Sequence, residues 1–334
     1  METRKLYYED PFQKGFATTV VSCDAVKGGY AVVLAETAFY PEGGGQPYDT
    51  GVLGEANVLE VHEKNGVITH LCDKPFEVGK SVSGKIDWAR RFDHMQQHSG
   101  EHICSGLICE RFLCDNVGFH MGADIVTIDF NADISWDELM EIEQLANLYI
   151  YEDHPIDIQF YRGAELDKVE YRSKKPLEGD VRIVSFPGAD CCACCGTHVV
   201  RSGQVGLVKF LSVQKFRDGV RIELLSGKRA HRYLSECWAQ DVRIAQALSV
   251  KPNASFAGVE RVLAELSALK QRCAKLEESV FAQTAAQYEG KDDVLLFEDE
   301  MSGDSLRKLC DAVTNHCGGR CAVFAGADGA YKYA

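Results

Sequence analysis

The sequence has no apolar run that approaches the roughly 20 residues a membrane-spanning helix needs. Its first residues, METRKLYYEDPF, lack the apolar core of a secretory signal peptide. We therefore expect no membrane partner, and a cytoplasmic location is the default expectation. The length of 334 residues predicts two or three domains rather than one.

An overall positive charge is also missing, because the net charge is −14. This excludes a protein that binds nucleic acid in bulk through a basic surface. The charge is nevertheless uneven: residues 171–232 contain 12 Lys and Arg but five acidic residues, so this segment is +7 and the rest of the chain −21. The segment suits binding to a specific polyanion, and the alternative is a solvated face balanced by acidic neighbours.

The cysteines do not form the dense framework of a small secreted domain, because the 14 thiols are spread over a large chain without a leader. Four of them, Cys191, Cys192, Cys194 and Cys195, lie together, with His198 close behind. Clustered thiols in a reduced protein indicate metal binding or catalysis. A thiol-based redox protein that uses this cluster is one alternative, and it would need an accessible thiolate of low pKa.

The periodicity predicts an α+β protein of four parts. Residues 1–88 contain short β-branched runs separated by glycines, which is typical of a small β-barrel. Residues 89–227 alternate helical and strand patterns and read as an α+β domain. Residues 228–289 are helical, and 290–334 begin a β-α-β unit that cannot bury both faces of a sheet. We expect this last α/β domain to be incomplete.

Two helical signals are specific. Ser135-Trp136-Asp137-Glu138 is a capping box that predicts the start of a helix. Residues 259–280 carry apolar side chains at alternating spacings of three and four, a heptad pattern over three repeats. This helix could pair with the preceding helix as a hairpin or form a homodimer through residues 259–280.

The strongest chemical signal is a pair of histidine motifs. His94 and His98 are four residues apart in a helical pattern, so both imidazoles can reach one ion. Cys194 and His198 have the same spacing in a loop about 100 residues later. Together these four residues make a plausible Zn²⁺ ligand set. Because no Glu stands between His94 and His98, the protease mechanism of H-E-x-x-H enzymes is disfavoured.

Alternative ligands exist for the same ion. Cys191 with Cys194, or Cys192 with Cys195, would each give a C-x-x-C pair, which is typical of a purely structural zinc site. His102 and His120 are interpreted as packing or surface histidines, although His120 follows a glycine and could face a pocket.

A glycine-rich motif spans residues 37–51 and includes the run Gly43-Gly44-Gly45-Gln46-Pro47. Three glycines allow positive φ angles and a close approach of the backbone to a ligand. It is not a P-loop, because no G-K-[ST] follows. The alternative interpretation is a tight β-turn that binds nothing.

These motifs resemble, in order, the editing domain of alanyl-tRNA synthetase and the AlaX proteins. The resemblance rests on Phe39 to Pro47, on His94-x-x-x-His98, and on Cys194-Cys195-Gly196-Thr197-His198, where the family usually has glycine at position 195. Residues 93–100 and the order of barrel, editing domain and coiled coil resemble the long AlaX type. The resemblance implies a zinc-dependent editing domain over residues 89–227, related to the second additional domain of the synthetase. The class II aminoacylation core is missing, so we do not expect this chain to charge tRNA.

The implied activity is hydrolysis of tRNA(Ala) that wrongly carries serine or glycine. A synthetic pocket sized for alanine cannot exclude glycine and rejects serine only modestly, so a second hydrolytic site is needed. A zinc-stabilised tRNA-binding module without catalysis is the alternative. Site residues follow from the motifs: catalytic Gln46 and Thr37; metal ligands His94, His98, Cys194 and His198; substrate-binding Gly43, Gly44, Gly45 and Thr197; and tRNA-binding Arg172, Lys174, Lys175, Lys215, Arg217 and Arg221.

Overall fold

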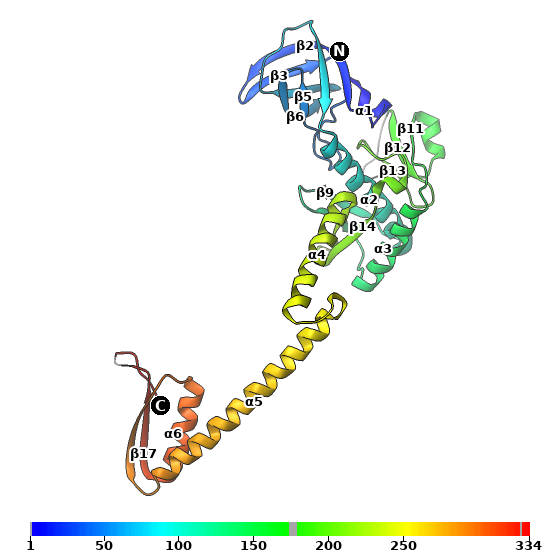
Figure 1. The fold of residues 1–334 in the computed structure, drawn as a ribbon. Coiled ribbons are helices and arrows are strands. Elements are labelled where there is room, and N and C mark those ends of the chain that lie inside the picture. Colours follow the sequence, from blue (N-terminus) through cyan, green and yellow to red (C-terminus); the bar gives the residue numbers. More distant parts are fainter. Residues whose placement is uncertain (1, 174–178, 328) are drawn as a thin grey trace. The chain divides into compact units, whose positions relative to one another are not determined.

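The computed structural model describes residues 2–173, 179–327 and 329–334 (Figure 1). The predicted α+β class is confirmed. The chain divides into two compact units, Met1–Glu236 and Cys237–Ala334. None of the described helices contains an apolar stretch long enough to cross a membrane.

The first unit begins with a closed barrel in the strand order β2-β3-β7-β6-β5-β8. Burial alternates along its strands, as in β2, where every second residue from Phe16 to Val20 is buried. The barrel encloses its own core, which includes Val32, Phe39 and Ile68. The elements of this region are β1 (Arg4–Lys5), α1 (Leu6–Glu9), β2 (Gly15–Val26), β3 (Gly29–Leu34), β4 (Glu36–Thr37), β5 (Gly51–Leu53), β6 (Ala56–Lys64), β7 (Val67–Cys72) and β8 (Ser81–Ile86).

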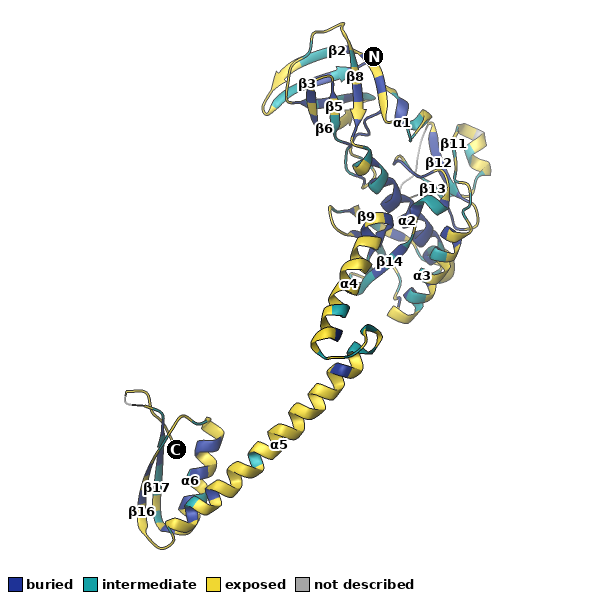
Figure 2. Cartoon of the chain, viewed as in Figure 1, coloured by how far each residue is buried: buried dark blue, intermediate teal, exposed yellow. Residues whose placement is uncertain are grey.

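A long helix, α2 (Trp88–Phe112), follows the barrel and is buried along most of its length (Figure 2). Asp87 caps it by accepting a hydrogen bond from the Arg90 amide. In its first turn, Arg91 donates to both carboxylate oxygens of Asp49 and to the Ala38 carbonyl, and both charged side chains are fully buried. This ion pair fixes the start of α2 against the glycine-rich segment of the barrel.

Two sheets and a second helix complete this part of the unit. One sheet has the order β14-β15-β10-β9 and the other β11-β12-β13. The predicted capping box of Ser135 and Glu138 is confirmed at the start of α3. The elements are β9 (Asn116–Met121), β10 (Val126–Phe130), α3 (Trp136–Tyr151), β11 (Asp157–Tyr161), η1 (Gly163–Lys168), β12 (Val181–Phe186), β13 (Asp190–Ala193), η2 (Ser202–Val205), β14 (Val208–Phe216) and β15 (Gly219–Ser226).

Helix α2 lies in the middle of this core and comes unusually close to β13. A Cβ atom on Gly106 would overlap the Ala189 carbonyl oxygen, so only glycine permits the contact. Met95 and Ile103 of α2 pack in the same apolar cluster as Phe186 and Ile222. The packing therefore brings one face of α2 against the loop that follows β13.

Helix α4 (Gly227–Ala247) starts in the first unit and continues into the second. The second unit also contains η3 (Pro252–Ala254), α5 (Ser255–Gln287), β16 (Asp292–Glu298), α6 (Gly303–Cys317), β17 (Gly318–Ala325) and β18 (Lys332–Tyr333). The predicted β-α-β unit is present, because β16 and β17 pair in parallel on either side of α6 in the sequence.

The heptad residues of α5 are not buried in a hairpin. Leu266, Leu269 and Leu276 are exposed, and Figure 2 shows most of this helix as exposed. Near its start, α5 meets the preceding segment at Gly258, which lies against Leu248 and Val250. The intramolecular pairing therefore stops within the first turns of α5, and the homodimer through residues 259–280 stays a prediction.

Candidate metal and substrate site

Four potential metal ligands meet at the face of α2 that lies against the loop after β13. They are His98, His102, Cys194 and His198, and their donor atoms lie within 4.8 Å of one another. The Cys194 sulfur is 3.5 Å from His98 Nε2 and 3.3 Å from His198 Nε2. Tetrahedral zinc with nitrogen and sulfur ligands places its donors roughly 3.5 Å apart, so these spacings fit such an ion.

Gln46 fixes the ring of His98 from behind. Its Oε1 accepts hydrogen bonds from the Thr197 amide at 3.0 Å and from His98 Nδ1 at 2.9 Å. Its Nε2 donates to the Thr197 hydroxyl at 2.9 Å. Because His98 Nδ1 is committed as a donor to Gln46, its Nε2 keeps the lone pair that a metal needs.

His102 and His198 are held in a similar way. His102 Nδ1 lies 2.8 Å from Asp190 Oδ2, and Arg172 makes two further hydrogen bonds to the same carboxylate, at 2.7 and 2.8 Å. His198 Nδ1 lies 3.4 Å from the Ser99 hydroxyl. A carboxylate behind a histidine orients the ring and raises its basicity as a ligand.

The electrostatics of the group favour a thiolate. Burial by itself raises the pKa of Cys194, but His98, His198 and His102 together hold it well below its usual range. Burial depresses the pKa of His198 well below its ordinary value, which keeps that ring neutral. A thiolate surrounded by imidazoles is the donor set that borderline-soft ions such as Zn²⁺ prefer.

Three of the four potential ligands, His98, His102 and Cys194, line a cavity of about 480 Å³. Its walls include Gly44 of the glycine-rich loop, Phe119 of β9, and Glu101 and Asn116. Asn116 Nδ2 donates to Glu101 Oε1 at 2.9 Å, while Asn116 Oδ1 is buried and has no hydrogen-bond partner among the described residues. A buried acceptor without a partner costs free energy, so this oxygen is suited to receive a donor from a bound molecule.

The group of potential ligands differs from the expected set at one position. His94 lies one helical turn before His98, outside the four-residue group, and His102 takes the fourth position. Both pairs have the same spacing of four residues, so spacing alone could not choose between them. The sequence signal that distinguishes them is Glu101, which stands between His98 and His102 and lines the cavity.

The glycine-rich loop lies beside the group, and a substrate-binding role for Gly43 to Gly45 stays a prediction. Gly44 lines the cavity, and Gly45 has a positive φ of 86° and packs so tightly on Phe119 that a Cβ atom would overlap the ring. Thr197 is buried against Gln46 rather than exposed in the cavity. A Cβ atom on Gly196 would overlap the His98 ring, which explains why glycine is needed at that position.

Thr37 lies elsewhere than a catalytic role would require. It is completely buried in the barrel, where its hydroxyl is 2.9 Å from His70 Nε2 and accepts a hydrogen bond from the Phe39 amide. It does not line the cavity. Thr37 lies only a few residues before the glycine-rich loop in the sequence, but its side chain is buried against His70.

The four described residues among those expected to bind tRNA are dispersed, and three of them have paired charges. Arg172 is committed to Asp190, Arg221 to Asp129 at 2.7 Å, and Lys215 lies 3.8 Å from Asp133. Arg217 has a positive φ of 54° and lies over the Phe216 ring. Lys174 and Lys175 lie outside the described residues.

The other cysteines of the cluster do not join the four donors. Cys192 belongs to an overlapping group with His102 and Asp190 that could also hold an ion. Burial raises the pKa of Cys191, Cys192 and Cys195, which disfavours thiolate chemistry at these three thiols. The alternative redox interpretation therefore has no support from them.

The barrel and the domain that carries the donors match parts of aminoacyl-tRNA synthetases. Residues 12–90 match the family described as tRNA synthetases class II (A), and residues 181–223 match the threonyl and alanyl tRNA synthetase second additional domain. The fold and site thus define a relative of a synthetase editing domain.

Individual relatives are more specific. The chain is 30% identical to alanyl-tRNA editing protein Aarsd1-A of Xenopus laevis, in a match that covers 85% of this chain and 73% of that protein. It is 31% identical to alanyl-tRNA editing protein AlaX-L of Pyrococcus horikoshii, in a match that covers 83% of this chain and 71% of that protein. It is also 36% identical to the alanine–tRNA ligase of Pyrococcus abyssi over 87% of this chain, but it spans only 33% of that protein. This chain belongs to the alanyl-tRNA editing protein family.

Proposed function

We propose that this chain is a trans-editing hydrolase that removes serine or glycine from mischarged tRNA(Ala). The observation that carries the proposal is the buried group of His98, His102, Cys194 and His198, which opens onto a cavity with a carboxylate and an unpaired amide oxygen in its wall. The names of the related editing proteins support the same class of reaction.

Those four residues would hold a Zn²⁺ ion, with Gln46, Asp190 and Ser99 behind three of them. When bound, zinc supplies a Lewis acid beside the ester and positions the end of the substrate. Four protein ligands would close a tetrahedral site, so a purely positioning role for the ion is compatible with this donor set. Gln46 is then a positioning residue for His98 rather than a catalytic one.

Glu101 is our candidate for the general base. Its Oε1 accepts hydrogen bonds from the Ser105 hydroxyl at 2.6 Å and from Asn116 Nδ2 at 2.9 Å, which fixes the carboxylate at the cavity wall. A water molecule beside Glu101 would lose its proton to the carboxylate as its oxygen bonds to the ester carbonyl carbon. The bond from that carbon to the ribose oxygen then breaks, and the proton passes to the ribose oxygen.

Asn116 is our candidate for recognising the amino acid. Its unpaired Oδ1 can accept a hydrogen bond from a seryl hydroxyl or from the α-ammonium group of the substrate. An alanyl group would leave a hydroxyl acceptor without a partner, and such an unpaired group is a strong basis for discrimination. Thr37 does not take this role, because its hydroxyl is engaged with His70 in the barrel.

The substrate partner is tRNA(Ala), and among the expected contact residues that the structure describes, Arg217 is the one without an ion pair. A homodimer through residues 259–280 and a cytoplasmic location stay predictions from the sequence.

The test measures hydrolysis of seryl-, glycyl- and alanyl-tRNA(Ala) by the zinc-loaded protein and by Glu101→Gln. We expect release of serine or glycine but not alanine, and a loss of about 10²–10⁴-fold in the rate for the variant, the range of general-base catalysis. His154→Ala, a change at a partly exposed histidine remote from the cavity, serves as the control and should keep the wild-type rate. If folded, zinc-loaded protein releases no amino acid, the binding module without catalysis replaces this proposal.

A further inference from the structure

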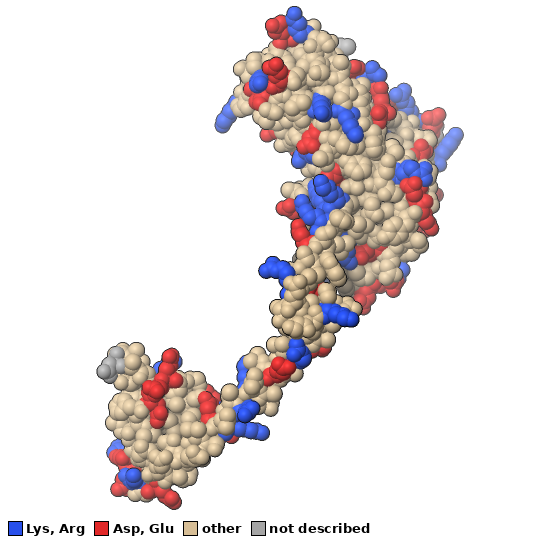
Figure 3. All heavy atoms as spheres, viewed as in Figure 1, with Lys and Arg blue, Asp and Glu red and all other residues tan. Residues whose placement is uncertain are grey.

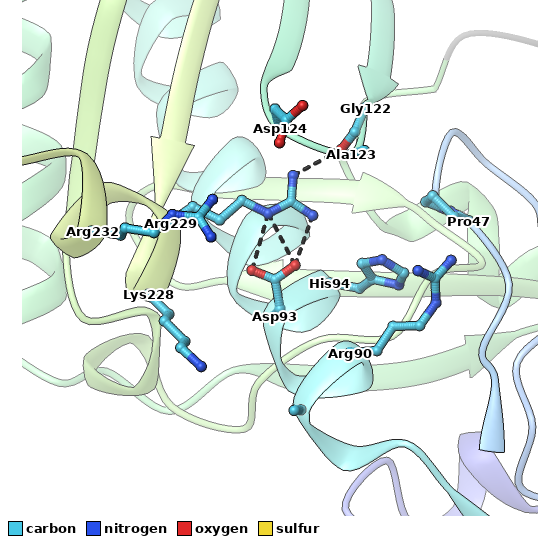
Figure 4. A pocket seen from close by; sticks show the side chains of 11 residues that line it. Pro47, Arg90, Asp93, His94, Gly122, Ala123, Asp124, Lys228, Arg229 and Arg232 are labelled. Atoms are coloured by element: carbon cyan, nitrogen blue, oxygen red, sulfur yellow. Dashed lines mark hydrogen bonds and ion pairs between the residues drawn. The ribbon is translucent and has the colours of Figure 1, made fainter. Parts of the chain in front are cut away.

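A second cavity, of about 420 Å³, is lined by Pro47 of the glycine-rich segment and by residues at the starts of α2 and α4 (Figure 4). Its walls are polar, and Figure 4 shows the side chains of Arg229, His94 and Arg90 near one another. We call it the basic cavity. It is lined by Pro47, Ala89, Arg90, Asp93, His94, Gly122, Ala123, Asp124, Lys228, Arg229 and Arg232.

The charges around the basic cavity do not balance. Four basic side chains face two carboxylates, and one of these, Asp93, is already bound by Arg229 at 2.7 Å. Lys228 and Arg232 are exposed, and no carboxylate in the described part of the chain forms an ion pair with either. Figure 3 shows Lys and Arg gathered on the surface where α4 begins. The cavity therefore carries an excess of positive charge.

The position of these residues in their helices increases that excess. Arg90 lies in the first turn of α2, and Lys228 and Arg229 lie in the first turn of α4. The amino ends of helices are already partly positive, so basic residues there are unfavourable unless an anion compensates them. The amides of Arg90 and Lys228 are already bonded to Asp87 and Gln96, so the side-chain cations are the groups left to meet an anion here.

A buried polar group points to the same ligand. His94 is only 3% exposed, and no group in the described part of the chain forms a hydrogen bond with its Nδ1. Burial, followed by the charges of Arg90, Arg229 and Arg91, lowers the pKa of His94 to about 3. The imidazole is thus surrounded by positive potential, with no acceptor for a proton on its buried nitrogen.

We call the cavity of about 480 Å³ beside His98, His102 and Cys194 the metal cavity. Three segments of the chain contribute residues to both this cavity and the basic cavity. Helix α2 contributes His94 to one and His98 to the other, four residues or about 6 Å apart along the helix axis. The glycine-rich loop contributes Pro47 to one and Gly44 to the other, and the β9 region contributes Gly122 and Phe119. A chain that ends in the metal cavity can therefore continue into the basic cavity around this loop.

We propose that the basic cavity binds a backbone phosphate of the single-stranded 3′ end of the tRNA. This inference rests on the proposed function for the position of the esterified 3′ end, but the anion site itself does not require hydrolysis. Lys228 and Arg232 supply the charges that are free to pair with the phosphate. Arg229 stays bound to Asp93 and shapes the wall.

The experiment measures the binding of two uncharged RNA hairpins to the full chain by fluorescence anisotropy. One is the tRNA(Ala) acceptor stem with its single-stranded 3′ end, and the other is the same stem without that end. We expect Lys228→Glu/Arg232→Glu to weaken binding of the first RNA by at least about tenfold and to leave the second unchanged. Lys228→Ala/Arg232→Ala should lower the salt slope of the first RNA by about 1.

The matched control is Lys27→Glu/Lys74→Glu, which makes the same change in charge at exposed positions of the barrel. It should bind both RNAs within about twofold of the wild type. Circular dichroism and zinc content verify that every variant is folded.

Three outcomes would overturn the inference. Equal affinities of wild type and Lys228/Arg232 variants for the RNA with a 3′ end would do so. A loss that is the same for both RNAs would place the contact on the double-stranded stem instead. Stabilisation of the wild type by inorganic phosphate alone, without a difference between the RNAs, would indicate a site for free phosphate.

The proposed function fails independently. Absence of hydrolysis together with the expected RNA binding would reject the hydrolase and keep the phosphate site. Hydrolysis together with unchanged RNA binding in the Lys228/Arg232 variants would do the reverse.

Discussion

The metal cavity and the basic cavity use consecutive turns of the same helix in opposite ways. In the metal cavity, His98 and His102 each have Nδ1 fixed by a neighbour, and both rings lie beside Cys194. In the basic cavity, His94 has a bare Nδ1 and arginines around it. The hydrogen-bond partner of a histidine and the charges around its ring therefore decide whether it is suited to bind a metal ion. The position of the histidine on the helix does not decide this by itself.

The largest effect should come from replacing the histidine of one cavity and then, in a separate variant, the histidine of the other. We expect His98→Ala to reduce bound zinc from about one ion per chain to nearly none, because a tetrahedral site loses one of its four ligands. His94→Ala should keep the zinc, since His94 lies outside the group. Metal analysis of the purified proteins after dialysis against a weak chelator checks both. Zinc loss in His94→Ala with retention in His98→Ala would reverse the comparison.

A smaller effect concerns the pH dependence of stability. The pKa of His94 is about 3 in the folded chain and ordinarily 6.5, so the unfolded chain takes up the proton first as the pH falls. The stabilising contribution is complete above the ordinary value and is lost between about pH 6.5 and pH 3. At about pH 4.5 the loss should reach roughly 2–3 kcal/mol relative to pH 7.

Guanidinium unfolding of wild type and His94→Gln at these two pH values measures that contribution. The variant lacks the imidazole, so its stability should fall less on acidification, by the same roughly 2–3 kcal/mol. Loss of zinc at low pH affects both proteins and cancels in the difference. Parallel curves for the two proteins would mean that His94 is not held neutral by its surroundings.

The smallest effect concerns Gln46, the hydrogen-bond partner of the potential metal ligand His98. Gln46→Ala removes the acceptor of His98 Nδ1 without removing a ligand, and we expect a loss of about 10–100-fold in zinc affinity. Competition with a chromophoric chelator measures it. Gln214→Ala, at an exposed position of β14, is the control and should bind zinc as the wild type does. An unchanged affinity in Gln46→Ala would show that packing alone orients His98.

Much of the local structure could be predicted because it depends on short-range patterns. The capping box at Ser135, the helical pattern of His94 and His98 and the heptad segment of 259–280 are all present as helices. The β-branched runs of the N-terminal region form strands, and the β-α-β pattern of residues 290–334 corresponds to β16, α6 and β17. What periodicity did not predict was whether the heptad face is covered, because that depends on a partner.

The residue types of the site could be predicted from the sequence. Which individual residues belong to the site could be predicted only in part. Three of the four donors, His98, Cys194 and His198, were identified from their spacing and from the family resemblance. From the sequence, His102 is interpreted as a packing histidine, because spacing alone does not separate two overlapping pairs that are each four residues apart. Arg221 and Lys215 were expected to contact tRNA, yet acidic side chains on other elements lie beside both.

The sequence by itself determined the helices, the strands and the kinds of ligand available, because each depends on residues a few positions apart. Only the tertiary structure decided which turn of α2 faces Cys194. The close approach at Gly106 brings the β13 loop to His102 rather than to His94. Likewise, only the fold placed the starts of α2 and α4 beside one cavity, where Lys228 and Arg232 remain without an acidic partner among the described residues.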